Sequence, residues 1–411
     1  MKTDLKAAGN RGDERYDVLI IGAGAAGTAC AIMLAQKGVR VAVSERDARA
    51  CVKLAATGNG RCNLSNSAVS PARYNDPIFV APALQAFGTA ETAAFFASLG
   101  IPVREKDGRL YPYGNNSGCV VNAFVAAVER LGIRMTVSSE ASGIERLRGG
   151  YRVRAAAEGK EKEFFAANVV FACGNNATSG KDSLSLMTSL GYKRTACVPA
   201  IAPIPTALFK GVSGVRAIAR GILTSGEEIL ADRRGEVLFR DDALSGMLAF
   251  ELSSAYARAL RAGRKDLSLA LDFAPDISAA YAEKLISSAP AYDIRGSLNG
   301  FVPRALAEKL AVIAGLRPSD PKEGRCSAVA AALRCTTALA GEAPQIKQAQ
   351  VVCGGLEVSA FDPRTMMSLT DRGLYAIGEA LDVDGECGGF NLQWAWSSAA
   401  ACARSITENR S

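Results

Sequence analysis

Residues 16–47 of the chain read YDVLIIGAGAAGTACAIMLAQKGVRVAVSERD, and this stretch predicts the fold of the N-terminal region. The apolar run at 16–21 is rich in Val and Ile, which is typical of a buried parallel strand. Three glycines with GxGxxG spacing follow it, and the apolar positions of 25–36 then recur with the period of a helix. Residues 39–44 predict a second strand. A strand, a glycine turn, a helix and a second strand in this order predict a dinucleotide-binding unit.

Each glycine of this motif has a physical task. Gly22 permits the tight turn out of the strand, Gly24 lets the backbone approach a pyrophosphate, and Gly27 lets the helix pack closely on the strand. The N-terminus of the helix offers N–H groups and partial positive charge to phosphates. Glu45 ends the second strand, where a carboxylate accepts hydrogen bonds from ribose hydroxyls. A glycine-rich turn without a ligand is the alternative, which we disfavour because strand, helix and acidic residue are all in register.

Three later segments favour FAD over NAD, which the first motif alone does not decide. Residues 53–63, KLAATGNGRCN, follow the second strand and predict a flexible loop with backbone N–H groups beside the cofactor. Residues 168–174, NVVFACG, predict a buried strand that returns to the sheet after a smaller β segment at 143–165. Residues 373–379, GLYAIGE, predict a strand that completes the nucleotide domain from the far end of the chain.

The segment CGGFNLQ at 387–393 and a small-residue helix expected at 394–406 complete this C-terminal part. The Gly388–Gly389 turn can bring backbone N–H groups against the isoalloxazine ring. The helix dipole would then stabilise negative charge on the reduced ring. These features together predict a flavoprotein rather than an NAD-dependent dehydrogenase, which would leave this segment unexplained.

The composition removes several classes of protein. The chain has 411 residues, 11 cysteines without a Cys-x-x-Cys pair, and no histidine. A structural zinc or other metal site is therefore not expected, and a Ser-His-Asp hydrolase is excluded. Any general acid or base must be Asp, Glu, Lys, Tyr, Cys or the cofactor. The absence of Cys-x-x-x-x-Cys argues against dithiol chemistry.

Charge and hydropathy indicate the surroundings that we expect. The net charge is +7, without a block of Lys or Arg, so no specific nucleic-acid partner is expected. No run of residues is apolar and long enough for a membrane span. The first residues, 1–14, are polar and predict a flexible leader without a secretory signal. Scattered cysteines in this context predict reduced thiols in the cytoplasm.

The length predicts more than one domain. We expect an FAD-binding domain from 15–195 plus 346–411, a β-rich substrate or cap domain from 196–247 plus 316–345, and a helical insertion at 248–315. The prolines at 198–205 favour extended chain at the domain crossing. A cap of this kind can close over the flavin and exclude water. A purely structural or oligomerisation domain is the alternative.

Three long motifs carry a family resemblance: TGNGRCN at 57–63, GRLYP at 108–112 and GEALDVDGECGGFNLQWA at 378–395. With them the chain resembles the HI0933-like flavoproteins over nearly its whole length. This family is often described as the aminoacetone oxidase family and includes the BaiN-type reductases of bile-acid metabolism. The resemblance implies an α/β fold with a Rossmann-type FAD-binding domain that is glutathione-reductase-like, a three-layer ββα arrangement. It also implies an inserted β-rich domain and a helical subdomain.

The resemblance also implies which residues line the FAD site. By their place in the family motifs these are Gly22, Gly24, Gly27, Glu45, Thr57, Asn59, Gly60, Arg61, Asn63, Gly378, Glu379, Gly389, Asn391 and Gln393. We expect their neighbours in the same segments to contact FAD as well, namely Ala25, Ala26, Arg46, Lys53, Gly58, Cys62, Cys173, Gly174, Asp382, Gly388 and Phe390.

The chain departs from the family pattern at two places. Family members typically have Ala-Thr-Gly-Gly on the third strand, where this chain has Ala-Cys-Gly-Asn at 172–175. They also usually carry LFTH-x-G-x-SGP in the middle domain, where this chain has LFRDDALSGM at 238–247. The Thr and His are replaced by Arg240 and Asp241, and the Pro by Met247. A changed substrate or proton donor would follow if the family's His contacts substrate.

Arg240, Asp241 and Tyr111 are accordingly the candidate catalytic residues. An Arg–Asp pair is more often structural, and buried core tyrosines are commoner than catalytic ones. Tyr113 is a second candidate for a phenolic donor near the flavin.

The expected activity is hydride transfer between flavin N5 and a small or amphipathic organic substrate. We favour NAD(P)H-dependent reduction of an activated C=C bond. The single dinucleotide fingerprint makes NAD(P)H a transient electron donor. A flavin-dependent, aminoacetone-type amine oxidase that uses O2 is the alternative within the class. A non-catalytic flavin sensor or an RNA-associated flavoprotein is the alternative from another class.

Overall fold

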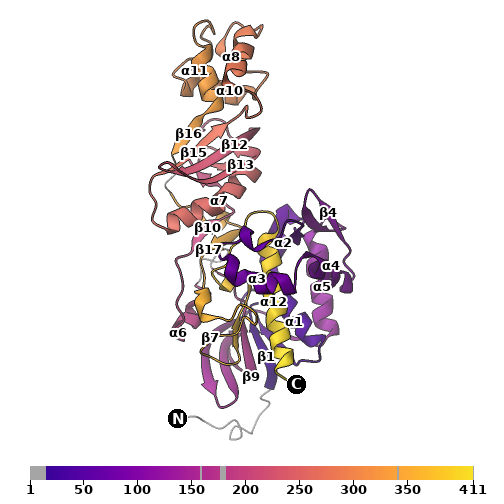
Figure 1. Ribbon diagram of the computed structural model, residues 1–411. Coiled ribbons are helices and arrows are strands. Elements are labelled where there is room, and N and C mark those ends of the chain that lie inside the picture. The colour runs from indigo at the N-terminus through magenta and orange to yellow at the C-terminus, as the bar shows by residue number, and fades with distance from the viewer. Residues whose placement is uncertain (1–14, 158–159, 176–181, 340–341, 411) are drawn as a thin grey trace. The chain divides into compact units, whose positions relative to one another are not determined.

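The computed structural model describes residues 15–157, 160–175, 182–339 and 342–410, except for the side chains of Asn59 and Leu339. The chain divides into two compact units, Met1–Cys197 with Gly354–Ser411, and Val198–Cys353. It therefore passes from the first unit to the second and back once. Figure 1 shows both units, each of which has its own hydrophobic core.

The first unit is built on a seven-stranded sheet, as far as the described residues show. The strand order is β6-β2-β1-β9-β8-β7, and β18 also pairs with β9. The strands are β1 Arg15–Ile21, β2 Val41–Ser44, β6 Arg134–Thr136, β7 Ser139–Leu147, β8 Gly150–Ala157, β9 Lys160–Phe171 and β18 Leu374–Ala376.

The central strands of this sheet are parallel. β1 lies between β2 and β9, with Ile21 opposite Ser44 on one side and Phe171 on the other. β18 is parallel to β9 and places Ala376 beside Phe171. The carboxyl ends of four strands that are far apart in the sequence therefore meet at one edge of the sheet. From β1 the chain continues to β2 on one side, and β9 later joins β1 on the other side. The strand order therefore reverses at β1, and open α/β sheets bind their ligands at such a switch point.

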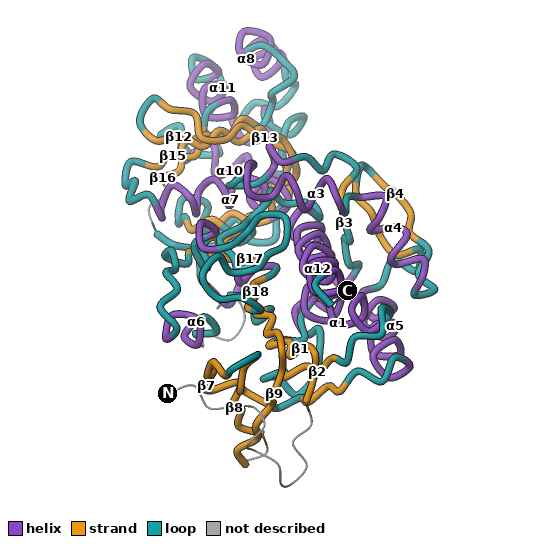
Figure 2. The backbone as a smooth tube through the Cα atoms, turned by 60° about the horizontal axis from the view of Figure 1, so that its bottom comes forward, coloured by secondary structure: helices purple, strands orange, loops and turns teal. Residues whose placement is uncertain are grey.

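Three long helices lie together beside the parallel strands, as Figure 2 shows: α1 Ala25–Ala35, α5 Ser117–Arg130 and α12 Phe390–Glu408. α1 and α12 pack against each other, and the buried Trp394 and Trp396 fix α12 in place. The indole N–H of Trp394 donates to the carbonyl of Gly378 at 3.1 Å, and that of Trp396 donates to Leu64 at 2.8 Å. These two bonds tie the C-terminal helix to Gly378 in the 373–379 segment and to Leu64, which follows the 53–63 segment.

Smaller elements surround this framework. β3, β5 and β4 form an antiparallel sheet in that order. The smaller elements of the first unit are α2 Val52–Gly60, β3 Ser65–Asn66, η1 Pro71–Arg73, α3 Pro77–Ala86, α4 Thr89–Ser98, β4 Val103–Lys106, β5 Arg109–Pro112, α6 Ser185–Ser189, η3 Val358–Ala360 and η4 Gly378–Ala380.

The segment 53–63 differs from the sequence prediction, because most of it is helix α2 rather than a loop. Its Lys-Leu-Ala-Ala start consists of good helix formers. Gly58 and Gly60 have φ values of +59° and +80°, so they close the last turn in left-handed conformations instead of opening a loop. Helix α12 also begins earlier than predicted, at Phe390, because Gly389 already caps it with φ at +105°.

The second unit contains a six-stranded antiparallel sheet in the order β11-β14-β13-β12-β15-β16, within the described residues. Helix α7 packs on β12 and β13, and a short pair, β10 with β17, lies where the chain enters and leaves the unit. The strands are β10 Val198–Ala200, β11 Ile204–Pro205, β12 Arg216–Ser225, β13 Glu228–Phe239, β14 Ala243–Ser245, β15 Leu267–Asp272, β16 Thr336–Leu339 and β17 Val351–Cys353.

The helices of the second unit are α7 Gly246–Arg261, α8 Ala279–Ser288, α9 Ile294–Ser297, α10 Arg304–Ile313, α11 Cys326–Arg334 and the short η2 Ile346–Gln348. The prediction of a helical segment at 248–315 is wrong at β15, which pairs with β12 and alternates buried and half-buried residues. Its LSLALD sequence has strand period, which the Ala- and Leu-rich surroundings obscured.

Two further properties follow from the described residues. None of their helices is both long enough and apolar enough to cross a membrane. All eleven cysteines are described, and they are thiols rather than disulfides.

Candidate dinucleotide and flavin site

The predicted cofactor segments converge at the carboxyl edge of the parallel strands. The turn at Gly22 follows β1, Glu45 follows β2, Gly174 follows β9 and Gly378 follows β18. A Cβ atom on Gly378 would lie only 2.8 Å from the Cβ of Ala26 in the first turn of α1, so the C-terminal segment closely approaches the N-terminal motif. The sheet topology therefore assembles one site from four separate stretches.

The three motif glycines have different reasons to be glycine. Gly22 has φ at +102°, and a Cβ there would meet the carbonyl oxygen of Ala172 at 2.5 Å. A Cβ on Gly27 would overlap the carbonyl oxygen of Gly22. By contrast, a Cβ on Gly24 would meet no atom within 4 Å. The protein's own packing excludes side chains at the first two positions, whereas at Gly24 it leaves open space.

Helix α1 begins at this open space without a side-chain cap. Its first residues, Ala25 and Ala26, carry no polar side chain that competes for the N–H groups of the first turn. Uncapped N–H groups at a helix N-terminus are a ready site for phosphate. The helix start therefore suits the pyrophosphate of a dinucleotide.

Glu45 lies beside the same turn. Its carboxylate accepts hydrogen bonds from the backbone N–H of Ala23 at 2.5 Å and of Asp47 at 2.8 Å. Burial raises the pKa of Glu45 above its ordinary value, and the two backbone bonds oppose that shift. The next residue, Arg46, forms long ion pairs of 3.9 Å with Asp47 and Glu140. Glu45 is thus held at the end of β2, where ribose hydroxyls are expected.

Lys53 and Glu379 form an ion pair across the site. The Lys53 ammonium on α2 lies 2.5 Å from the Glu379 carboxylate on η4, although the two residues are 326 positions apart. The Lys53 side chain is 30% exposed and that of Glu379 is 21% exposed. The pair joins the segment after β2 to the segment after β18.

Asn63 holds a buried acceptor without a partner in the described residues. Asn63 is 9% exposed, and its side-chain oxygen Oδ1 has no hydrogen-bond donor. This oxygen lies 3.0 Å from the Cβ position of Gly389, which is the cap of α12. Buried acceptors are nearly always satisfied in folded proteins. The Asn63 oxygen is therefore available to accept a hydrogen bond from a ligand.

The remaining residues of the 57–62 segment are placed as follows. The Thr57 hydroxyl donates to the carbonyl of Leu54 at 2.8 Å, so it bonds within α2. Arg61 is exposed and follows the last turn of α2. Asn59 belongs to α2, but its side chain is outside the described part, and Gly58 and Gly60 end the helix as given above.

Helix α12 presents the Gly388–Gly389 turn to this acceptor. Gly388 and Gly389 have φ values of +123° and +105°, and α12 begins without a side-chain cap. A Cβ on Gly389 would lie 2.5 Å from the carbonyl oxygen of Ser65, and Asn66 donates to the carbonyl of Gly388 at 2.9 Å. The turn is therefore pressed against β3, with the first N–H groups of α12 uncapped.

The side chains of Gln393 and Asn391 are bonded within the protein. Gln393 is fully buried, and its amide is fully used: the oxygen accepts from Ser65 at 2.5 Å and Thr92 at 3.0 Å, and the nitrogen donates to the Phe87 carbonyl and to Ser397. Asn391 bonds both ways to the backbone of Gly385. Their side chains position the first turn of α12 and leave no polar atom of Gln393 for a ligand.

Asp382 and Phe390, which are also predicted to contact FAD, are held in place by residues that the sequence analysis does not identify. Asp382 accepts from the Thr195 hydroxyl at 2.8 Å, and Asn75 donates to the backbone carbonyl of Asp382 at 3.0 Å. The carbonyl of Phe390 accepts from the hydroxyl of Tyr74 at 2.8 Å. These positioning residues come from segments without a recognisable motif, so no sequence signal identified them.

Burial disfavours the thiolate form of three cysteines near the site. Burial raises the pKa of Cys51 to about 11 and the pKa values of Cys62 and Cys173 to about 12. The Cys173 thiol lies 3.1 Å from the carbonyl of Ser183. Because thiols react as thiolates, these raised pKa values disfavour reaction of the three cysteines at neutral pH.

The candidate catalytic residues lie in different units. Tyr111 is half-buried on β5, opposite Arg104 of β4 in the first unit. Arg240 and Asp241 lie in the second unit and do not pair with each other. Arg240 pairs with Asp242 at 3.3 Å, and Asp241 accepts from the backbone N–H of Gly211 at 2.9 Å. These contacts hold the turn between β13 and β14 in place.

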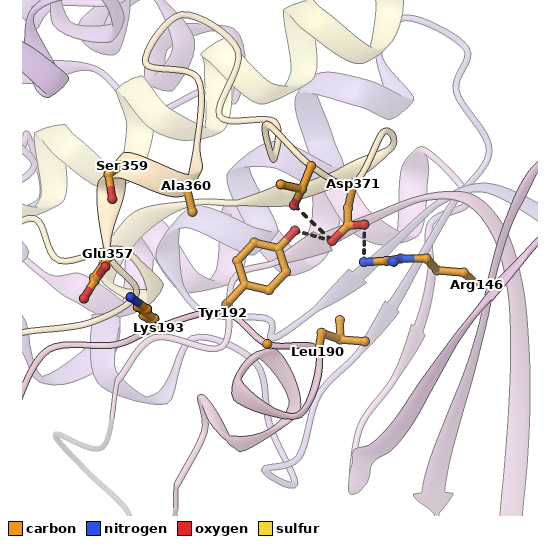
Figure 3. Close-up of a pocket in the computed structure, with 10 residues that line it drawn as sticks. Arg146, Leu190, Tyr192, Lys193, Glu357, Ser359, Ala360 and Asp371 are labelled. Carbon is orange, nitrogen blue, oxygen red and sulfur yellow. Dashed lines mark hydrogen bonds and ion pairs between the residues drawn. The ribbon is translucent and has the colours of Figure 1, made fainter.

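A separate hollow of about 390 Å³ lies in the first unit. Figure 3 shows it around Tyr192, whose hydroxyl donates to the buried carboxylate of Asp371 at 2.6 Å. Arg146 forms an ion pair with the same carboxylate, while Lys193 and Glu357 line the opposite end. Asp371 lies three residues before β18, so this network anchors the strand that leads to Gly378.

The site fits FAD on the evidence of its own residues. The open position at Gly24, the uncapped start of α1 and the carboxylate of Glu45 match a dinucleotide. The isoalloxazine ring of FAD has an N–H donor and carries negative charge when reduced. The unpaired Asn63 oxygen and the uncapped start of α12 suit these two properties. The described residues contain no group of three or more His, Cys, Asp or Glu side chains that could hold a metal ion.

The fold and the site define an FAD-binding Rossmann-type α/β protein with an inserted antiparallel β domain. A family model described as the HI0933-like protein Rossmann domain matches residues 16–405. The chain belongs to the HI0933-like family, and it is an FAD-dependent oxidoreductase.

Two characterised relatives cover nearly the whole chain. The 3-dehydro-bile acid delta(4,6)-reductase of Clostridium scindens is 30% identical over 407 residues, which are 95% of this chain and 98% of that protein. The ribosomal RNA dihydrouridine synthase of Escherichia coli is 26% identical over 411 residues, with 97% and 100% coverage.

Solved structures support the fold alone. A 3-ketosteroid delta1-dehydrogenase from Sterolibacterium denitrificans, in complex with 1,4-androstadiene-3,17-dione, aligns with a TM-score of 0.52. The alignment covers 96% of this chain and 100% of that chain at 12% identity.

Proposed function

We propose that this protein reduces a C=C bond conjugated to a carbonyl group in a small or amphipathic organic molecule, with NAD(P)H as a transient electron donor. The substrate would gain a hydride at the carbon remote from the carbonyl and a proton at the adjacent carbon. NAD(P)H would supply the two electrons and become NAD(P)⁺. When bound, FAD supplies the hydride transfer at N5.

The observation that carries this proposal is the chemistry shared by the relatives. A delta(4,6)-reductase of a 3-dehydro bile acid acts on double bonds that extend from a ketone. Conversion of uridine to dihydrouridine likewise saturates a ring C=C bond beside a carbonyl. Two relatives with very different substrates thus share one reaction type, and both align with more than nine-tenths of this chain.

The residues at the site are compatible with this reaction. The uncapped start of α12 favours negative charge beside it. Burial raises the pKa of Cys62 and Cys173 to about 12, which disfavours thiolate chemistry at these positions. Because the chain has no histidine, the proton at the second carbon must come from water or from an Asp, Glu, Lys, Tyr or Cys side chain.

Charge pairing favours an organic substrate over ribosomal RNA. Proteins that bind nucleic acid neutralise phosphates with available Lys and Arg side chains. In the second unit, many arginines are instead engaged with carboxylates, in the pairs Arg216–Glu236, Arg220–Asp232, Arg234–Asp276, Arg264–Glu228, Arg304–Glu308, Arg317–Asp320 and Arg334–Asp272. The net charge of +7 is therefore not concentrated on the surface of the second unit.

The test begins with anaerobic addition of NADPH or NADH to the purified protein. Bleaching of the flavin spectrum, followed by reoxidation on addition of a steroid 4-en-3-one, is the expected result. Mass spectrometry should then find a product heavier by two hydrogens. Reoxidation by a uridine-containing ribosomal RNA transcript, but not by the enone, would assign RNA as substrate.

Two other outcomes would overturn the proposed reaction. A flavin that stays oxidised with both nicotinamides, but is reduced by aminoacetone and reoxidised by O2, would make the protein an amine oxidase. A flavin that no substrate of either class oxidises or reduces would favour the sensor alternative.

A further inference from the structure

The Lys53–Glu379 ion pair joins the two halves of the site. Lys53 lies on α2, the first helix after β2 and Glu45, and Glu379 lies on η4, the first element after β18. Their 2.5 Å contact spans 326 residues of sequence. Both side chains are partly buried, at 30% and 21% exposure, so solvent screens the pair less than it screens a surface pair.

Glu379 lies where a bound dinucleotide would bring negative charge. The neighbouring Gly378 packs on Ala26 in the first turn of α1. The Glu379 carboxylate lies 3.9 Å from the Cβ position of Gly174, which follows β9. The start of α1 is the expected place of the pyrophosphate, which carries two negative charges. An uncompensated carboxylate at this edge would repel that group.

The edge already holds a second carboxylate, that of Glu45. The nearby Arg46 is directed to Asp47 and Glu140. Among the described residues, Lys53 is the cation in direct contact with Glu379. The compensation at Glu379 therefore rests on this one residue.

We propose that Lys53 is the counter-ion that allows Glu379 to stand beside the pyrophosphate, so that FAD affinity depends on the pair rather than on Lys53 alone. This inference rests on the FAD assignment above and extends it to a positioning residue. Lys53 acts through Glu379: it neutralises the carboxylate and fixes its direction.

A double-mutant cycle on FAD affinity tests this role. The dissociation constant of FAD is measured by flavin fluorescence on titration with protein stripped of cofactor. Lys53→Met should weaken binding about 10- to 100-fold, because a partly buried carboxylate loses its partner. In the Glu379→Gln background, the same Lys53 change should alter affinity by less than about threefold. Lys53→Arg should bind close to wild type.

Ionic strength provides a readout that a purely structural role would not change. The deficit of Lys53→Met should shrink as salt rises, because salt screens repulsion between Glu379 and the pyrophosphate. The matched control is the pair Arg154–Glu161, which is an exposed ion pair of 3.9 Å on β8 and β9. Arg154→Met and Glu161→Gln should leave FAD affinity unchanged at every salt concentration.

The outcomes separate the two levels of inference. If Lys53→Met weakens FAD binding equally in both backgrounds, Lys53 contacts the cofactor directly and the counter-ion role is wrong. If wild-type protein itself takes up no FAD, the FAD assignment fails and the inference fails with it. Circular dichroism of each variant without FAD checks folding, and Lys53→Gln replaces Lys53→Met if the latter does not fold.

Discussion

Gly24 has no structural need to be glycine. Its φ is −75°, which any residue adopts, and a Cβ on it would meet nothing within 4 Å. Gly22 and Gly27 differ, because backbone atoms occupy the place of their missing side chains. A ligand is the remaining physical reason for glycine at position 24.

Gly24→Val should therefore keep the fold and lose FAD. We expect FAD affinity to fall by about 100-fold or more, because the side chain would fill the phosphate space. Fluorescence titration measures the affinity, and thermal unfolding without FAD should match wild type. Gly300→Val is the control, since its Cβ position is also open and its φ lies outside the left-handed region. Wild-type FAD content in Gly24→Val would contradict the assignment.

Asn63 and Gln393 are two buried amides with opposite roles. The Asn63 oxygen has no partner among the described residues, whereas every polar atom of Gln393 is bonded. A buried unpaired acceptor destabilises a protein by about 1–3 kcal/mol. The FAD-free protein is thus expected to tolerate loss of the Asn63 amide but not of the Gln393 amide.

The paired prediction uses chemical unfolding with and without FAD. Asn63→Leu should leave the free energy of unfolding of the FAD-free protein unchanged or raise it by about 1 kcal/mol, and should reduce the extra stability that FAD confers. Gln393→Leu should lower the free energy of unfolding of the FAD-free protein by about 3 kcal/mol. The reason is that Ser65, Thr92, Ser397 and the Phe87 carbonyl all lose a hydrogen-bond partner. Equal losses in both variants without FAD would show that Asn63 is bonded within the protein.

Strand β18 depends on an anchor at its N-terminal side. The buried Asp371 carboxylate accepts from Tyr192 and pairs with Arg146 of β7, and the carbonyl of Arg372 accepts from Tyr151 at 2.9 Å. Burial raises the pKa of Tyr151 to about 12, so it remains a donor at neutral pH. The element that delivers Gly378 is therefore held from the far side of the sheet.

Arg146→Met should destabilise the protein more than Asp371→Asn. The first change leaves a buried carboxylate without its cation, whereas the second removes the charge and keeps the shape. Since the Arg146 side chain is 55% exposed, we expect a loss of only about 1–3 kcal/mol for Arg146→Met. Urea unfolding measures both variants. A larger loss for Asp371→Asn would show that the Tyr192 bond, not the ion pair, dominates.

At the scale of elements, the sequence was most informative where one period continues undisturbed. β1, α1 and β2 lie within a few residues of their predicted bounds, because their apolar residues are buried on the faces that the pattern indicated. The 53–63 segment was misread because glycines favour both loops and helix ends. β15 was missed because alanine and leucine suit a strand and a helix equally in a short run.

The whole molecule consists of two units with separate cores, and both tryptophans belong to the first. Trp394 and Trp396 are the two tryptophans of the chain, and both lie buried on α12. Their fluorescence consequently reports unfolding of the first unit alone. Far-ultraviolet circular dichroism reports the helices and strands of both units.

FAD should shift the two signals differently. At a free FAD concentration of about 100 times Kd, binding adds about 2.7 kcal/mol to the unit that holds it. The tryptophan transition should therefore move to higher temperature, while a part of the circular dichroism transition stays in place. Scans at several FAD concentrations measure this. Coincident shifts of both signals would mean that the units unfold as one.

Glycine spacing and strand period are local properties, so the sequence predicts the class of cofactor and the residues of its first motif. It also indicates the segments at 168–174 and 373–379, since each is a short apolar run that leads to a glycine, Gly174 or Gly378. Which of these residues keep a polar atom for a ligand depends on contacts between segments that are distant in the sequence. The Gln393 amide is fully hydrogen-bonded to its neighbours, whereas the Asn63 oxygen has no partner among the described residues. Lys53 contacts Glu379 because parallel strands bring distant segments to one edge of the sheet.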